Sequence, residues 1–257
     1  MPDHLVQYST DHGIARVALD SPANRNALSA ALMSQLGQAL ADAAADDGVR
    51  AVELTHTGPA FCAGADLSEA RQGGMAAGTQ SLAAMLRQLV SMPKPVVGSI
   101  DGHVRAGGMG LVGACDIVLA GPSSTFAFSE VRLGLAPAII SLTTLPRLSP
   151  RAAGRYYLTG ETFGAADAAR IGLVTEAVED IDSATLALLD VLRAASPQGL
   201  AATKALLTPG LLDGFDDRAE TLIGRSAQLF ASDEAAEGMA AFLEKRPPRW
   251  VMRPEID

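Results

Sequence analysis

The chain has 257 residues, of which 48% are hydrophobic and 19% charged, and its formal net charge is −9 at pH 7. This length buries a sizeable core and fits one large domain, or one domain with a small C-terminal appendage. The composition is that of a globular protein. Nucleic acid binding requires a basic face opposite the phosphates, so the acidic balance argues against a nucleic acid partner.

The cysteines and the apolar runs indicate the cellular compartment in which we expect the protein. Cys62 and Cys115 lie far apart without metal-ligand spacing, so we expect buried reduced thiols, no disulfide framework and no metal site. Residues 1–10 show no basic region followed by an apolar run, and the longest small or apolar run, 106–115, is about half a membrane span. We therefore expect a soluble cytoplasmic protein without a membrane segment.

The chain begins with a β-β-α-β pattern. Residues 5–8 and 14–19 are strand-like and are separated by a turn. Ser29 is a typical N-cap, and apolar residues recur at helical spacing over 30–45. A buried strand is predicted at 49–54, after the helix.

The same alternation continues and then gives way to helices. A helix near 80–92 precedes a strand at 96–100, a glycine-rich loop, an apolar helix and a strand at 117–119. Beyond residue 137 strand signals thin out, apart from 172–178. Helices are predicted there at 183–195, 197–207, 216–230 and 233–243. We place the α/β core at 1–195 and a helical C-terminal region at 196–257.

A loop of small residues at 61–67 (FCAGADL) follows the third strand. Small side chains let backbone N–H groups approach a ligand closely, as an oxyanion site requires. A tight turn without function is the alternative for this loop.

A second glycine-rich loop, 101–110, joins a buried strand to an apolar helix, where free N–H groups and the helix dipole favour negative charge. Residues 108–113 also match the spaced glycines of dinucleotide-binding proteins, with Glu130 near the position of a ribose-binding acid. However, these glycines fall inside the predicted helix, whereas the dinucleotide turn begins directly at the strand. The dinucleotide interpretation is therefore disfavoured.

Six short segments follow one another along nearly the whole chain: 61–67 (FCAGADL), 94–97 (KPVV), 107–108 (GG), 115–117 (CDI), 129–134 (SEVRLG) and 241–246 (AFLEKR). In order and spacing they resemble the crotonase (enoyl-CoA hydratase/isomerase) superfamily. The resemblance implies an α/β fold, a crotonase/ClpP-like spiral of ββα units with a C-terminal helical trimerisation region. It also implies a homotrimer or a dimer of trimers.

The resemblance assigns the reaction centre. It implies that the backbone N–H groups of Ala65 and Gly107 hold the thioester oxygen of an acyl-CoA, where enolate charge develops. Glu130 matches a family catalytic glutamate. A carboxyl group in an apolar pocket has a raised pKa, which lets it move a proton near neutral pH.

Further residues are assigned to coenzyme A, which is part of the substrate, so we expect no separate cofactor. The resemblance implies that Ala63 and Leu67 bind the adenine end and that Arg25 meets phosphate. Phe242 and Lys245 complete the site, and in relatives the residues at these two positions reach it from a neighbouring subunit. A C-terminal helix that merely packs is the alternative for this pair.

The sequence departs from the family at Gly110, where hydratases usually carry a second glutamate. Two carboxylates normally divide the work of activating water and delivering a proton. His103 and Arg105 stand where relatives have apolar or aromatic residues, so either is a candidate to replace the lost acid or bind a substrate carboxylate. The alternative is that both face solvent.

We therefore expect an enoyl-CoA hydratase-like lyase, with residues 134–138 closest to hydratases of branched or carboxylated enoyl-CoAs. The first alternative is an enoyl-CoA isomerase with Glu130 as its sole acid and base. Another enolate lyase and an acyl-CoA-binding protein with vestigial activity are the remaining interpretations.

Overall fold

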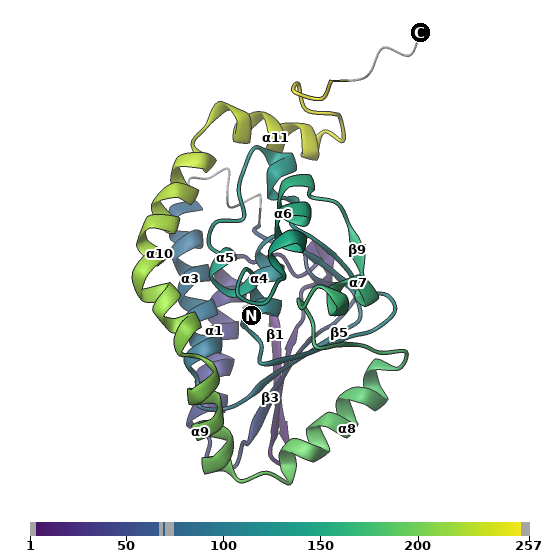
Figure 1. Ribbon diagram of the computed structural model, residues 1–257, viewed down its shortest axis with the longest axis vertical. Helices are drawn as coiled ribbons and strands as arrows, with labels where there is room; N and C mark the ends of the chain where they lie inside the picture. The colour runs from purple at the N-terminus through teal and green to yellow at the C-terminus, as the bar shows by residue number, and fades with distance from the viewer. Residues whose placement is uncertain (1–3, 67–68, 70–74, 253–257) are drawn as a thin grey trace.

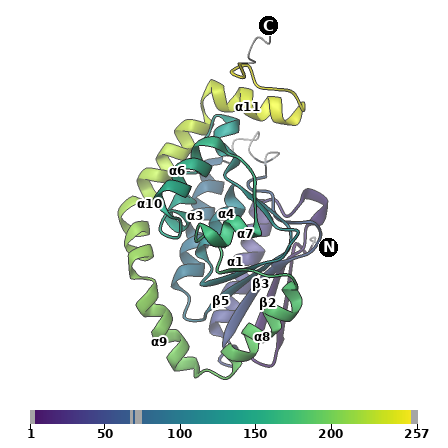
Figure 2. The same cartoon turned by 45° about the vertical axis from the view of Figure 1, so that its right-hand side comes forward.

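A six-stranded sheet and a four-stranded sheet form the centre of the computed structural model, which describes residues 4–66, 69 and 75–252. Helices cover both faces of the larger sheet, and the longest helix runs along the outside of the molecule (Figures 1 and 2). The mixed α/β fold predicted from the sequence is confirmed.

The larger sheet has the strand order β1-β2-β3-β5-β7-β10, with β1 and β2 antiparallel and the other pairs parallel. The predicted hairpin and the predicted strands at 14–19 and 96–100 are confirmed. The strands are β1 (Val6–Asp11), β2 (Ile14–Leu19), β3 (Ala51–His56), β5 (Val96–Ile100), β7 (Ile117–Ala120) and β10 (Glu176–Ala177).

Successive side chains of a strand point to opposite faces, so this sheet has two apolar faces. Val52 and Val96 belong to the main core, which also contains Leu36 of α1 (Ala30–Ala45). Ala51 and Val97 pack instead against α8 (Ile181–Arg193). The helix predicted at 30–45 is confirmed, and its N-cap Ser29 accepts a hydrogen bond from Leu32 N.

The smaller sheet was not predicted. Its strands are β4 (Ala60–Cys62), β6 (His103–Arg105), β8 (Thr125–Ala127) and β9 (Phe163–Gly164). Each strand has only two or three residues, which is too few for the alternation of apolar and polar residues typical of a strand to show in the sequence. The prediction of a continuous loop over 101–110 is therefore wrong at β6. Because β4 and β6 pair in parallel, the parts of the two glycine-rich segments that follow these strands, from residues 63 and 106 onward, leave the same sheet edge.

The helices after β3 place the second loop and the outer wall. α3 (Met75–Ser91) packs beside α1, and the wholly buried α4 (Gly107–Ala114) begins directly after the second loop. The glycines of 108–113 do lie inside this helix, as expected. Short 3-10 turns occur at Pro22–Asn24 (η1) and Ser129–Leu133 (η2).

Helices dominate the remainder of the chain. The helices predicted at 197–207 and 233–243 are confirmed, whereas the one predicted from residue 216 begins earlier, because Pro209 fits the first turn of a helix. Three short helices were not predicted: α5 (Ser141–Thr144), α6 (Pro150–Thr159) and α7 (Ala165–Arg170). The others are α9 (Pro197–Leu207), α10 (Pro209–Phe230) and α11 (Asp233–Leu243).

A buried lysine fastens these helices to the sheet. Lys204 of α9 is 4% exposed, and its Nζ lies 2.8 Å from Asp116 Oδ2. The same ammonium donates to the carbonyl oxygens of Leu89 (2.8 Å) and Lys94 (3.0 Å). All three of its protons are satisfied, so α9 is held at the end of α3. The domain boundary after residue 195 stays a prediction.

Candidate active site

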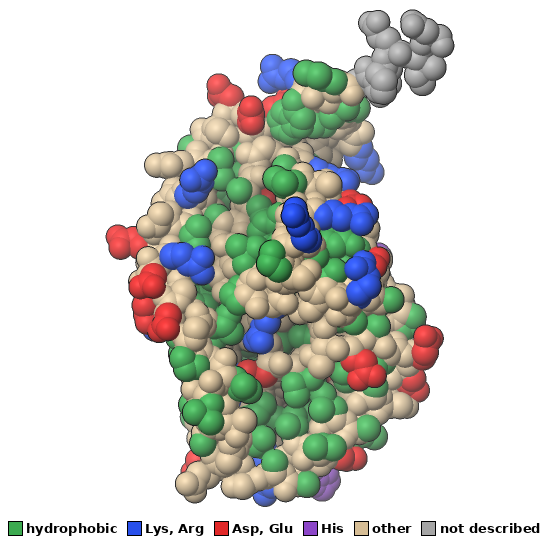
Figure 3. Space-filling view, in the orientation of Figure 1, with side chains coloured by type: hydrophobic (Ala, Val, Ile, Leu, Met, Phe, Trp, Pro, Cys, Tyr) green, Lys and Arg blue, Asp and Glu red, His purple; other side chains and the backbone are tan. Residues whose placement is uncertain are grey.

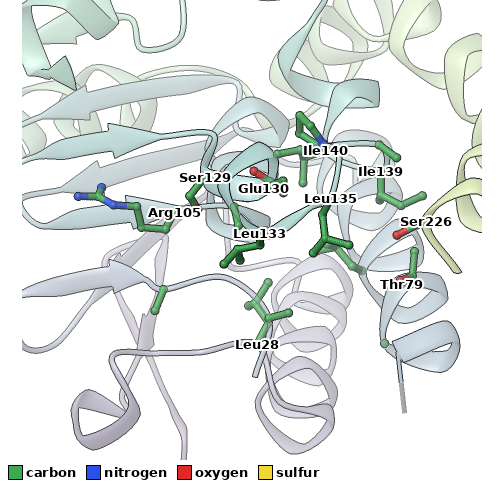
Figure 4. Close-up of a pocket in the computed structure, with 18 of the residues that line it drawn as sticks. Leu28, Thr79, Arg105, Ser129, Glu130, Leu133, Leu135, Ile139, Ile140 and Ser226 are labelled. Carbon is green, nitrogen blue, oxygen red and sulfur yellow. The ribbon is translucent and has the colours of Figure 1, made fainter. Parts of the chain in front are cut away.

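A cavity of about 480 Å³ lies between α3, α10, η2 and the two glycine-rich loops (Figure 4). Of the site residues that the sequence singles out, the structure brings together Arg25, Ala63, Ala65, Arg105, Gly107, Glu130 and Phe242 in its lining. His103, Gly110 and Lys245 do not line it. Leu67 lies outside the described residues.

The two loops touch at Gly64. This glycine has a φ of +93°, and a Cβ built on it would lie 2.9 Å from the Cβ of Ala106 and 3.5 Å from Gly107 N. Only a glycine permits both this positive φ and such a close contact with residues 106 and 107. The amides of Ala65 and Gly107 are thereby brought close to each other at the cavity wall.

Both amides are available to a ligand. Within the described residues, neither the Ala65 N–H nor the Gly107 N–H donates to another protein group. Gly107 is the first residue of α4, where backbone N–H groups have no intrahelical partner. The residue before it, Ala106, has φ 45° and ψ −117°. Such a conformation costs about 1–3 kcal/mol in a non-glycine residue and is typical of functional sites.

Glu130 lines the same cavity, on η2. It is 8% exposed, and its Oε2 has no hydrogen-bond partner among the residues described. Burial raises the pKa of Glu130 to about 7, although its own backbone N–H opposes the shift. The carboxyl group therefore exchanges a proton near neutral pH, as proton transfer to carbon or water requires.

The helix α11 of the same chain supports η2 and closes one side of the cavity. A Cβ at Gly238 of α11 would lie 2.5 Å from the carbonyl oxygen of Leu133. A Cβ at Gly134, the left-handed residue that ends η2, would lie 2.7 Å from the backbone of Glu234. Phe242 of α11 lines the cavity of its own chain. A contribution of this helix to the site of a neighbouring subunit stays a prediction.

Ile140 fills the space beside Gly110. A Cβ at Gly110 would lie 2.7 Å from Ile140 Cγ2 and 3.1 Å from Leu86 Cδ1. Ile140 lines the cavity and is 3% exposed. Where hydratases of the family usually carry a second carboxylate, this chain therefore presents a hydrocarbon side chain to the cavity.

The two polar residues of β6 are held by Thr125 on the neighbouring strand. Arg105 donates to Thr125 O (2.7 Å) and Thr125 Oγ1 (2.9 Å), and His103 Nδ1 lies 2.8 Å from the same hydroxyl. In Figure 4 the Arg105 guanidinium points away from Glu130. Their part as a substitute acid or as a carboxylate ligand stays a prediction, one that this geometry does not favour.

The lining residues that the sequence analysis did not single out include two hydroxyl residues, Thr79 of α3 and Ser226 of α10. Both are buried hydroxyl residues on helices whose inner faces are otherwise apolar. A polar residue inside an apolar helical stripe was the available signal. The rest of the lining is mainly hydrocarbon, from Leu28, Met33, Leu82, Leu133, Leu135, Ile139, Ile140 and Phe230.

No group of three or more His, Cys, Asp or Glu side chains that could hold a metal ion occurs in the described part of the chain. Among the helices described, none is long and apolar enough to cross a membrane.

Comparison with known proteins places this site in a family. Residues 9–253 match the family model of enoyl-CoA hydratase/isomerase. The crystal structure of an enoyl-CoA hydratase from Mycobacterium avium is 56% identical, with a TM-score of 0.91 over 97% of this chain and 100% of that one. An enoyl-CoA hydratase from Shewanella pealeana is 32% identical, with a TM-score of 0.77 over 96% of both chains.

A curated relative, mevalonyl-coenzyme A hydratase of Aspergillus fumigatus, is 30% identical over 96% of this chain and 94% of its own length. Fold and site together define an acyl-CoA enzyme of the crotonase class. The chain belongs to the enoyl-CoA hydratase/isomerase family.

Proposed function

We propose that this protein adds water to a 2-enoyl-CoA, with Glu130 as its single acid and base. The observation that carries this proposal is a buried carboxyl group with a pKa of about 7 that shares a cavity with two backbone N–H groups for which the described residues supply no acceptor. Relatives named enoyl-CoA hydratase, similar along the whole chain, support it.

One carboxylate suffices for the addition because the proton it removes is the proton it delivers. Water attacks carbon 3 while Glu130 takes one of its protons, and negative charge passes to the thioester oxygen. The N–H groups of Ala65 and Gly107 donate to that oxygen and stabilise the enolate. Glu130 then protonates carbon 2. One O–H bond of water breaks, a C–O and a C–H bond form, and the carboxylate is restored.

Coenzyme A, as part of the substrate, is assigned to the residues near the first loop, with no separate cofactor. Ala63 N donates to Arg25 O at 3.1 Å, so the two residues present one continuous surface at the cavity. We assign adenine to Ala63 and Leu67 and phosphate to Arg25. Phe242 supplies an apolar contact from α11, and Lys245, just beyond that helix, a positive charge.

A second candidate, enoyl-CoA isomerisation, is favoured by Ile140 beside Gly110. An isomerase moves one proton between two carbons and needs no activated water, so a hydrocarbon side chain beside residue 110, in place of a second carboxylate, suits it. In that reaction Glu130 removes a proton from carbon 2 of a 3-enoyl-CoA and returns it to carbon 4.

Product mass separates the candidates. The purified protein is incubated with a 2-enoyl-CoA and, separately, with the matching 3-enoyl-CoA. Hydration of the 2-enoyl-CoA adds the mass of one water and supports the proposal. Conversion of the 3-enoyl-CoA alone, without a change in mass, would show an isomerase. Tight binding without turnover of either would leave an acyl-CoA-binding protein.

We propose an assembly through the C-terminal surface. Phe242, Leu243, Val251 and Met252 are exposed, and Figure 3 shows hydrophobic side chains gathered at the end of the molecule where α11 lies. We assign this surface to contacts between copies in a homotrimer or a dimer of trimers, which light scattering tests. Two buried free thiols, Cys62 and Cys115, fit a cytoplasmic location, where thiols stay reduced.

A further inference from the structure

Two buried hydroxyl groups lie at one end of the acyl cavity. Thr79 is 6% exposed and Ser226 8% exposed, and both line the cavity. Figure 4 shows them together, beyond Leu135 and Ile139 as seen from Glu130. The proton-transfer chemistry of Glu130 does not use them.

Thr79 stands where its helix otherwise buries hydrocarbon. Ala83, Leu86 and Val90 are buried on α3, and their spacing of four and three residues continues from Thr79 along the same face. Thr79 thus places one hydroxyl residue on an otherwise apolar helix face that lines the cavity.

Ser226 stands in the corresponding place on α10. Leu211 and Phe215 are buried on that helix, and Leu222 packs partly buried against the core, which leads at helical spacing to Ser226. Each of two facing helices thus carries one hydroxyl residue on its apolar face.

Because α3 and α10 pack side by side, Thr79 and Ser226 lie at similar heights along the two helices. α3 and α10 pack along each other, and the ion pair between Arg87 Nη1 and Asp216 Oδ1, at 2.7 Å, fixes their register. Thr79 precedes Arg87 by eight residues and Ser226 follows Asp216 by ten. At about 1.5 Å per residue, the two antiparallel helices carry them about 12 and 15 Å along the same direction.

The pair lies within reach of a short acyl chain. A Cβ at Gly107 would lie 3.5 Å from Leu82 Cδ2, so Leu82 borders the proposed oxyanion site. Thr79 precedes Leu82 by three residues, or about one helical turn. An acyl group held at Gly107 and extended along α3 therefore meets the hydroxyl pair.

The hydroxyls can bind a ligand. Across the residues that the structure describes, Ser226 Oγ forms no hydrogen bond to protein although the side chain is more than nine-tenths buried. Thr79 keeps a partner of its own. A hydroxyl has one proton and two lone pairs, so Thr79 still has capacity for a second hydrogen bond.

We propose that Thr79 and Ser226 select an enoyl-CoA whose acyl group ends in an uncharged hydrogen-bonding group, such as a hydroxyl. This inference rests on the proposed acyl-CoA site. Two neutral hydroxyls compensate a buried carboxylate poorly. Among the groups described, a hydrocarbon terminus would leave the buried Ser226 hydroxyl without a hydrogen-bond partner.

The test compares 2-enoyl-CoAs of four to eight acyl carbons that end in a methyl, a hydroxymethyl or a carboxylate group. kcat/KM is measured for the wild type, Thr79→Val, Ser226→Ala and the double variant. We expect the wild type to prefer the hydroxyl-ended form at one chain length, by about threefold to tenfold for each hydrogen bond. Each substitution should lower that preference, through KM more than kcat.

Thr221→Val and Ser81→Ala are matched controls, because they remove exposed hydroxyls from the same two helices. They should leave the preference unchanged. A wild type that prefers methyl-ended or carboxylate-ended substrates at every length would overturn the inference, as would a hydroxyl preference that survives in the double variant.

A separate binding experiment distinguishes a failure of this inference from a failure of the proposed function. The affinities of saturated acyl-CoAs with the same three termini are measured by calorimetry. If no enoyl-CoA is turned over, the proposed function fails. A hydroxyl preference in binding that the double variant loses still supports the pair, and equal affinity for all three termini contradicts it.

Discussion

Ile140 Cγ2 lies 2.7 Å from the point where a Cβ on Gly110 would stand. The glycine and the isoleucine fit each other: one provides the space that the other fills. Real Cβ atoms do not approach this closely, so a larger residue at 110 requires a change at 140. The chain therefore lacks the second carboxylate at residue 110, and the packing of Ile140 fills the space that it would need.

The first prediction concerns this pair. Gly110→Ala should lower the free energy of unfolding by about 1–3 kcal/mol, because the added methyl group overpacks the core. Combining it with Ile140→Ala should cost less than the sum of the two single changes, which denaturation in urea measures. Gly224→Ala, on an open position of α10, is the control and should be neutral or stabilising. Strict additivity would show that the two positions do not compete for space.

The second prediction is that Glu130 destabilises the fold at alkaline pH. Its pKa rises from an ordinary 4.5 to about 7 on folding, so the folded state binds the proton more tightly than the unfolded state. The contribution of Glu130 to stability is then greatest below about pH 4.5 and is lost as the pH rises through 7. Glu130→Gln should thus be more stable than the wild type at about pH 8.5, by about 3 kcal/mol, and nearly equal at about pH 4.5.

Urea denaturation at the two pH values checks this result. Glu220→Gln, which changes an exposed carboxylate on α10, serves as the control. A wild type as stable as Glu130→Gln at high pH would mean that the Glu130 carboxylate is well solvated or paired.

The third prediction concerns the attachment of the C-terminal helices. Burial lowers the pKa of Lys204, whereas Asp116 opposes that shift and stabilises the charged form. Lys204→Met should lower the free energy of unfolding by about 3–5 kcal/mol, because it leaves the Asp116 carboxylate without its cation. Lys204→Met with Asp116→Asn should recover much of the loss. A single variant as stable as the wild type would show that α9 is held by apolar contacts alone.

Much of the fold could be predicted because its long elements carry strong local signals. The stripe of α1, the continuous apolar strand β5 and the Ser29 cap each specify local structure on their own. The strands β4, β6 and β8 could not be predicted, since each is three residues long and forms only by pairing with distant strands.

The site was predictable to the extent that it depends on backbone and sequence motif. The glycine-rich loops and Glu130 stand in recognisable segments. The strained backbone of Ala106 could not be predicted, because an alanine in a sequence does not indicate a positive φ. The filling of the Gly110 position by Ile140, thirty residues away, and the hydroxyl pair at Thr79 and Ser226 depend on tertiary packing alone.

The rate of water addition to a 2-enoyl-CoA by wild type and Glu130→Gln, measured as kcat/KM from about pH 5 to pH 9, tests the central claim most directly. In the wild type kcat/KM should rise with pH and level off above about pH 7, because the ionised carboxylate accepts the proton of water. The variant should be about 10²- to 10⁴-fold slower and lack this rise. A variant that keeps the wild-type rate and pH profile would contradict Glu130 as the acid and base of this enzyme.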